Sequence, residues 1–234
     1  MDLFSSFTHL IGAIAFAGLG VSLVREARSD RRIALVVFSV CCSLVLLASG
    51  LFHLMPYGGA ARYVMHRVDH AAIFLFIAAT FTPIHAIVFR GPGRWGVLTA
   101  VWTIAIVGLI FKMLYFSSMP QGLSLALYMA FGWLGLASGI ALSQRLGYAF
   151  VRPLAAGAVA YTVGALADYF GWPILMPHLI GSHELFHVAV LAGIACHWRL
   201  VRRLAVAPLK AGAPARHQLR WSRSTPSCEP FLPA

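Results

Sequence analysis

The chain has 234 residues, of which 60% are hydrophobic and only 11% are charged, and its formal net charge is +11. A soluble domain carries about 25% charged residues, so this composition excludes an ordinary soluble protein and indicates an integral membrane protein. The apolar runs are continuous, whereas the strands of a membrane β-barrel alternate apolar and polar residues, so we expect a bundle of helices.

Apolar runs of about 20 residues predict transmembrane helices, because a helix of that length crosses the hydrocarbon core. Seven such runs follow one another along the chain, at 6–24, 33–55, 68–89, 95–116, 122–142, 153–172 and 180–200. Short connections that contain Pro and Gly separate several of them. We therefore expect an all-α membrane protein, a seven-transmembrane helix bundle, over residues 1–200. The basic, Pro-rich residues 201–234 are expected to form a disordered cytoplasmic tail.

The distribution of positive charge predicts how the bundle is oriented. Given seven spans, Arg62, Arg67 and Lys112 fall on one side, and the other 15 of the 18 Lys and Arg residues fall on the opposite side. Because Lys and Arg are retained on the cytoplasmic side, we expect the N-terminus outside and the C-terminus in the cytoplasm of a plasma (inner) membrane. This pattern accounts for the net charge without a nucleic-acid partner. Lys112, at an outer helix end, is expected to snorkel to the surface.

Histidines at the outer ends of two runs form a candidate metal site. His183 and His187 are four residues apart, so they share one face of the last run. His53 lies at the end of the second run, on the same predicted side of the membrane. Three histidine ligands and an open fourth position are typical of catalytic zinc. We therefore predict that His53, His183 and His187 bind Zn²⁺, which supplies hydroxide at neutral pH from a bound water.

Two further polar residues are expected beside this metal. Asp69 lies at the start of the third run, at a matching depth, and is predicted to accept the proton of the bound water. Ser49 precedes His53 by one helical turn, where its hydroxyl would hydrogen-bond a substrate carbonyl or orient Asp69. The alternative is that all of these polar residues only join helices through hydrogen bonds.

Several segments resemble the hemolysin III family, part of the progestin and adiponectin receptor (PAQR) group of seven-transmembrane proteins. Ser49-Gly-Leu-Phe-His53 is similar to the Ser-x3-His of that family, 67–73 to its Asp-His segment, and 182–187 to its signature on helix seven. Segments 8–12 and 128–133 extend the resemblance. It implies a seven-helix bundle with zinc on the three histidines named above and with Asp69 and Ser49 beside the water.

The resemblance also implies kinship with zinc-dependent lipid amidases such as ceramidases, and a membrane lipid as substrate or ligand. We therefore expect a zinc-dependent hydrolase of a lipid amide or ester. Bacterial members take their name from a reported pore-forming behaviour, so the alternatives are a pore-forming cytolysin and a membrane-homeostasis receptor or sensor with a structural zinc. The sequence assigns no role to His9, His66 or His70, and it does not define the oligomeric state.

Overall fold

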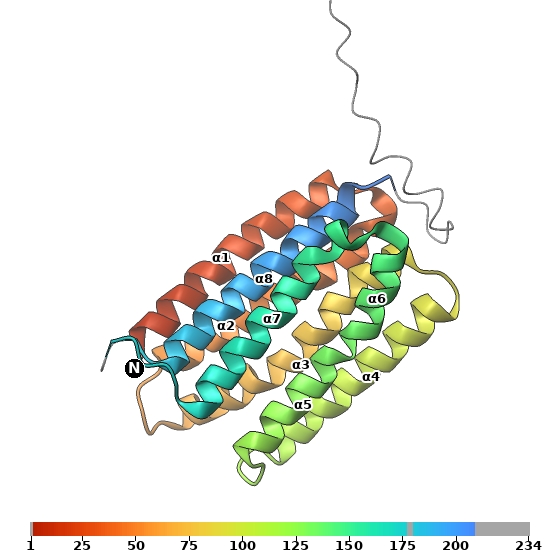
Figure 1. Ribbon diagram of the computed structural model, residues 1–234. Coiled ribbons are helices and arrows are strands. Elements are labelled where there is room, and N and C mark those ends of the chain that lie inside the picture. The colour runs from red at the N-terminus through yellow and green to blue at the C-terminus, as the bar shows by residue number, and fades with distance from the viewer. Residues whose placement is uncertain (1, 177–179, 209–234) are drawn as a thin grey trace, which may run out of the picture.

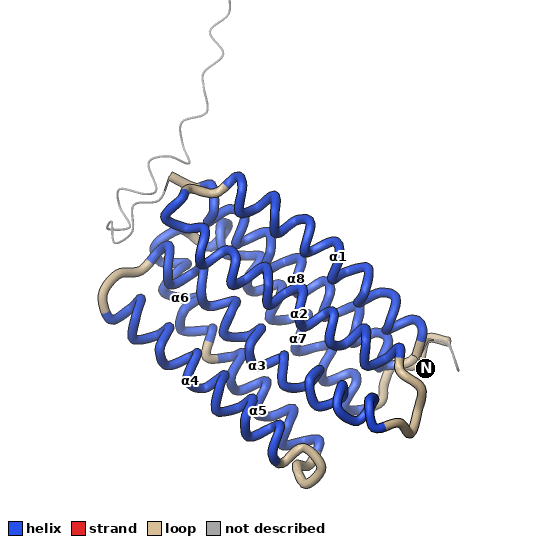
Figure 2. Tube along the Cα trace, turned by 180° about the vertical axis from the view of Figure 1, so that it is seen from behind, coloured by secondary structure: helices blue, strands red, loops and turns tan. Residues whose placement is uncertain are grey.

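The computed structural model describes residues 2–176 and 180–208, and this part of the chain forms one bundle of helices. The α-helices run roughly alongside one another (Figures 1 and 2). They are α1 (Leu3–Glu26), α2 (Arg32–Leu54), α3 (Ala60–Val88), α4 (Pro92–Leu114), α5 (Gln121–Trp133), α6 (Gly135–Leu146), α7 (Tyr148–Phe170) and α8 (Ser182–Val206), with the 3-10 helix η1 (Ser29–Arg31) before α2. Within the described residues, seven segments are long and apolar enough to cross a membrane, with α5 and α6 together forming one of them. The predicted seven-helix bundle is confirmed.

Helix α8 lies between α1 and α7 (Figure 1). It packs extensively against α7 and also contacts α1, α2 and α3 (Figure 1). Its C-terminal end is held by the buried Arg31, whose guanidinium donates to the carbonyl oxygens of Leu204, Ala205 and Ala207 at 2.7, 3.1 and 2.7 Å. The last carbonyl oxygens of a helix lack donors within the helix, and lipid offers none. Arg31 therefore supplies the hydrogen bonds that these oxygens need.

Glycines allow α7 and α8 to approach each other closely. A Cβ atom added at Gly164 would lie 2.5 Å from the Cβ atom of Ala189, and one added at Gly193 would lie 2.3 Å from the ring of Tyr161. Small residues are usual at contacts between membrane helices, where close packing replaces the hydrophobic effect as the driving force. This contact fixes the end of α7 beside the start of α8.

Helix α3 begins eight residues earlier than the sequence pattern predicted. Residues 60–67 include Arg62, His66 and Arg67, whose polarity placed them outside the apolar run. In the structure, Arg62 donates to the carbonyl oxygens of Phe52 and Met55 at the end of α2, so this extra helix is tied to its neighbour. Asp69 consequently lies nine residues inside α3 rather than at its start.

The fifth span is interrupted and the last span is longer than predicted. Leu134 separates α5 from α6, and the break is flanked by Gly132 and Gly135, which weaken a helix. Helix α8 continues to Val206, six residues beyond the predicted end. The rest of the predicted tail, from residue 209 onward, lies outside the described residues.

Candidate metal centre

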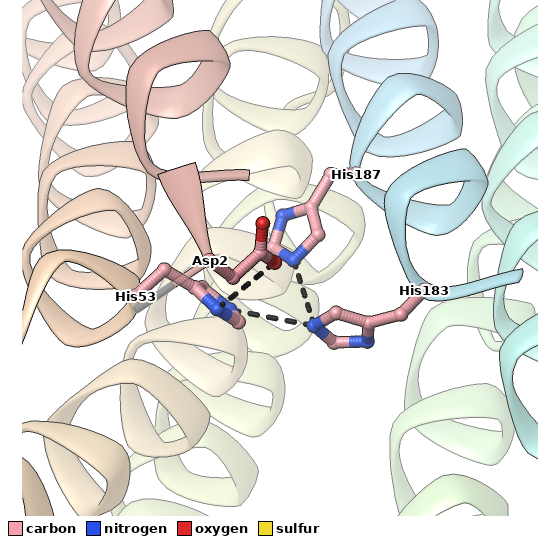
Figure 3. Close-up of side chains that lie close together, drawn as sticks. All are labelled: Asp2, His53, His183 and His187. Carbon is pink, nitrogen blue, oxygen red and sulfur yellow. Dashed lines mark hydrogen bonds and ion pairs between the residues drawn. The ribbon is translucent and has the colours of Figure 1, made fainter. Parts of the chain in front are cut away.

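Four side chains meet at the end of the bundle that holds the N-terminus (Figures 1 and 3). Asp2 precedes α1, His53 lies in the last turn of α2, and His183 and His187 lie in the first two turns of α8. One ligand atom from each of the four lies within 4.8 Å of those of the others, so the group could hold a metal ion. The fold thus brings together all three histidines predicted as ligands and adds a carboxylate. We call these four residues the metal group, and this end of the bundle the metal end.

The nitrogen atoms of the metal group have the spacing that tetrahedral coordination of a metal ion requires. The Nε2 atom of His183 lies 3.1 Å from Nε2 of His187 and 3.5 Å from Nε2 of His53 (Figure 3). With metal–nitrogen bonds of about 2.0–2.1 Å, the nitrogens of a tetrahedral site are about 3.3 Å apart. The residues present therefore fit a metal ion bound by three imidazoles.

One carboxylate oxygen of Asp2 accepts a hydrogen bond, and the other has no hydrogen-bond partner. Its Oδ1 accepts from the backbone N–H of Ser5 at 3.1 Å and so caps α1. Its own N–H donates to the carbonyl oxygen of His53 at 3.2 Å, which ties the start of α1 to the end of α2. Its Oδ2 is buried, lies 3.5 Å from Nδ1 of His53 and makes no hydrogen bond. A bound cation would compensate this buried oxygen.

His183 is oriented by a carboxylate of α7. Its Nδ1 atom lies 3.0 Å from Oδ1 of Asp168. When Nδ1–H donates to a carboxylate, the lone pair of Nε2 is left for a metal and the ring is held in place, as is usual for metal-binding histidines. Sequence reasoning missed Asp168, because its role depends on the close contact between α7 and α8.

Polar side chains also connect the metal group to the two residues predicted as catalytic. Nδ1 of His187 lies 3.0 Å from Nε2 of His9, and Nδ1 of His9 lies 2.9 Å from Oγ of Ser49. The Ser49 hydroxyl in turn interacts with the carboxylate of Asp69. His187, His9 and Ser49 are all buried. Ser49 and Asp69 therefore lie together beside the metal group, whereas the carboxylate within the group comes from Asp2, a residue that sequence reasoning missed because it precedes the first apolar run.

A cavity of about 1000 Å³ extends from the metal group into the interior of the bundle. It is lined by His53 and His183 at the metal end and by Ser138 and Tyr148 towards the opposite end. Side chains along its middle are mainly apolar, among them Ile73, Phe76, Ile77, Ile84, Leu125 and Leu154. Ligand cavities in proteins commonly measure about 300–1,000 Å³, so this one has room for a long-chain ligand.

Comparison with known proteins assigns the chain to a family. The profile of the family described as haemolysin-III related matches residues 1–198, a range that includes the whole metal group. The chain belongs to the haemolysin III family. Hemolysin-3 of Bacillus cereus is 33% identical over 199 residues, covering 83% of this chain and 87% of that protein. The Hemolysin-3 homolog of Bacillus subtilis (strain 168) is 28% identical over 198 residues, covering 83% of this chain and 89% of that protein.

Membership in the haemolysin III family agrees with the architecture. The match covers nearly all of the described helices, and the described residues contain seven candidate membrane spans. The chain is therefore a multi-pass membrane protein of this family. Its metal group could hold a metal ion.

Proposed function

We propose that this haemolysin III protein is a membrane-embedded zinc hydrolase that cleaves an amide or an ester in a membrane lipid. The proposal depends on one observation, the position of three facing imidazoles at the end of a large, mainly apolar cavity. Three histidine ligands and an open position suit catalytic zinc. A lipid with its chain in the apolar part of the cavity would present its polar linkage to these histidines.

Each polar residue around the cavity would have a separate task. His53, His183 and His187 would hold the zinc, which acts as a Lewis acid and activates water for attack on a carbonyl group. Asp69 would accept the proton of the attacking water and return it to the leaving amine or alkoxide, as a general base and then a general acid. Ser49, between His9 and Asp69, would hold the Asp69 carboxylate in position.

The position of Asp2 favours a second candidate function. Its carboxylate is close enough to the three histidines to act as a fourth protein ligand. Four protein ligands are typical of structural zinc, because they leave no position for water. A structural zinc would suit a pore-forming cytolysin, the activity for which bacterial members of the family are named, or a membrane sensor.

Zinc content and hydrolysis, measured on the same purified protein, separate the two functions. We expect about one zinc per chain, and loss of most of it in the His53→Ala/His187→Ala double variant. Asp69→Asn should keep its zinc while lipid hydrolysis falls by about 10²–10⁴, the usual effect of losing a general base. Asp2→Asn keeps a residue able to cap α1 and should retain both zinc and hydrolysis.

Two outcomes would contradict the hydrolase. Loss of zinc from Asp2→Asn would make the site a four-ligand, structural one. Leakage of liposomes caused equally by wild type and Asp69→Asn, together with no hydrolysis of lipid amides or esters by wild type, would favour the cytolysin.

We further propose that the metal end faces the outside of the plasma (inner) membrane, with the N-terminus outside and the C-terminus cytoplasmic. Most described cations lie at or near the opposite end of the bundle, namely Arg25, Arg28, Arg31, Arg32, Arg90, Arg94, Arg145, Arg152, Arg199, Arg202 and Arg203. Among the described residues, the metal end has only Arg62, Arg67 and Lys112. Retention of positive charge in the cytoplasm supports this orientation.

A further inference from the structure

Lys112, near the C-terminal end of α4, points into the bundle instead of reaching the surface. It is only 4% exposed, and its Nζ atom donates to Oγ of Ser124 at 2.7 Å. The same Nζ lies 4.7 Å from the centre of the Phe116 ring. The expectation that this lysine snorkels to the surface is therefore wrong, because a hydroxyl on α5 and an aromatic ring offer its ammonium group a site inside the protein.

The charge of Lys112 is not neutralised by an acidic side chain in the described part of the chain. Its contacts there are with Ser124, Phe116 and the sulfur of Met119, and none of the ion pairs formed by the described residues includes it. A buried ammonium group without a counter-ion is costly. This site would therefore be stabilised by an anion.

Two arginines add to the positive charge near Lys112. Arg67 lies with its guanidinium 4.9 Å from the Tyr63 ring and 5.9 Å from the Phe116 ring, so Arg67 and Lys112 flank the same phenylalanine. Arg62, one turn earlier on α3, is bound by carbonyl oxygens. None of the ion pairs among the described residues involves either arginine. Among the carboxylates at the metal end, Asp69 and Asp168 pair with His70 and His183 instead.

The cavity of the metal group reaches this region, although Lys112 and Arg67 themselves do not line it. Arg62, His66 and His70 line the cavity from one face of α3, at four-residue spacing, and Ser124 lines it from α5. The Ser124 oxygen accepts from Lys112, so the hydroxyl proton must be donated elsewhere. Among the described residues the Ser124 hydroxyl makes no second hydrogen bond, so its proton is available to a ligand in the cavity.

A hydroxyl bound to a buried ammonium group that has no counter-ion among the described residues indicates an anionic ligand. A hydroxyl that accepts from an ammonium group is a stronger donor, and charge-assisted hydrogen bonds to anions are about twice as strong as neutral ones. A phosphate suits such a site best, because one of its oxygens can accept from Ser124 while its negative charge lies close to Lys112. The apolar remainder of the cavity indicates that this phosphate belongs to a lipid rather than to a free ion.

We propose that the cavity binds an anionic lipid, with its phosphate beside Ser124 and Lys112 and its acyl chain in the apolar interior. The lipid linkage would then lie between the phosphate and the chain, at the metal group. This inference rests on the proposed function in naming the class of lipid that the hydrolase would accept. Binding can nevertheless be measured without turnover, so the two proposals can fail separately.

The test compares two lipids that differ only in the phosphate. Binding of 1-oleoyl lysophosphatidic acid and of 1-oleoylglycerol to the purified, full-length protein in detergent would be measured by native mass spectrometry, with inorganic phosphate as a third ligand. We expect the phosphate-bearing lipid to bind at least about tenfold more tightly, since a hydrogen bond to a charged group is worth that much. Lys112→Met should remove most of this preference, and Ser124→Ala should weaken it while leaving the lysine in place.

Arg152→Met is the matched control, because it removes an exposed positive charge near the opposite end of the bundle and should leave the preference unchanged. Equal binding of the two lipids to wild type would overturn the inference. So would an unchanged preference in both Lys112→Met and Ser124→Ala, or binding of inorganic phosphate as tight as that of the lipid. A retained preference for the phosphate-bearing lipid with no hydrolysis would contradict only the proposed function.

Discussion

Each histidine of the metal group has its own polar neighbour. Asp168 contacts Nδ1 of His183, His9 contacts Nδ1 of His187, and the Asp2 carboxylate lies beside His53. A hydrogen bond to one ring nitrogen, as His183 and His187 have, holds the ring and leaves the opposite nitrogen for the metal. The three ligands are therefore positioned by residues of α1 and α7 as well as by α2 and α8, so that most of the bundle contributes to one site.

The contact between Asp168 and His183 gives a prediction for metal affinity. Asp168→Ala should weaken zinc binding by about 10- to 100-fold, the usual effect of removing a carboxylate that orients a histidine ligand. Competition with a chelator would measure it. Asp30→Ala, which removes an exposed aspartate paired with Arg28, should have no effect. The same affinity in both variants would show that Asp168 does not orient the metal ligand.

At the level of single residues, the sequence predicted the ligands better than their neighbours. His183 and His187 share a face because of their spacing, so helical periodicity alone was enough to pair them. Asp2 and Asp168 could not be recognised, since each acts across a contact between helices that no local pattern encodes. Lys112 was predicted wrongly, because its position near a helix end does not reveal that Ser124 offers it a partner inside the bundle.

At the level of elements, the contact between α7 and α8 determines whether the metal group forms. Asp168 lies one turn beyond Gly164 on α7, and His183 is the second residue of the facing helix. Gly164 lies against Ala189 with no room for a side chain. A change in the distance between these helices would therefore move Asp168 relative to His183 and alter the metal group.

Gly164→Ala should destabilise the protein and weaken its metal binding. The added methyl group would lie 2.5 Å from the Cβ atom of Ala189, so the helices must separate, at a cost of about 1–3 kcal/mol. The melting temperature should fall, and zinc should be lost to a chelator more readily than from wild type. Gly18→Ala on α1 is the control, because its Cβ would meet nothing within 4 Å and alanine favours a helix. Equal melting temperatures for the two variants would contradict this account of the contact.

The elements themselves were largely predictable, because spans of about 20 apolar residues are fixed by membrane thickness. The early start of α3 was not predictable from hydropathy. Its polar residues lower the hydropathy of the segment, and the hydrogen bonds to α2 that stabilise it there cannot be seen in the sequence. The break at Leu134 was not predicted either, because glycines are tolerated in membrane helices and mark an interruption only in some contexts.

For the molecule as a whole, the orientation of the bundle decides on which side of the membrane the metal group works. The seven spans place the metal group and the N-terminus at the same end, and the proposed lipid would reach both the metal group and Lys112 from that end. Since 11 of the 14 described Lys and Arg residues lie at or near the opposite end, we expect a reporter fused after Ala234 to be active in the cytoplasm. A tag placed before Met1 should be accessible to an impermeant reagent in intact cells.

A reporter fused after Leu114, at the end of α4, is the internal control, because it should share the outer location of the N-terminal tag. If the N-terminal tag and the Leu114 fusion are both protected while the C-terminal reporter is external, the metal group faces the cytoplasm, and its lipid would have to come from the inner leaflet.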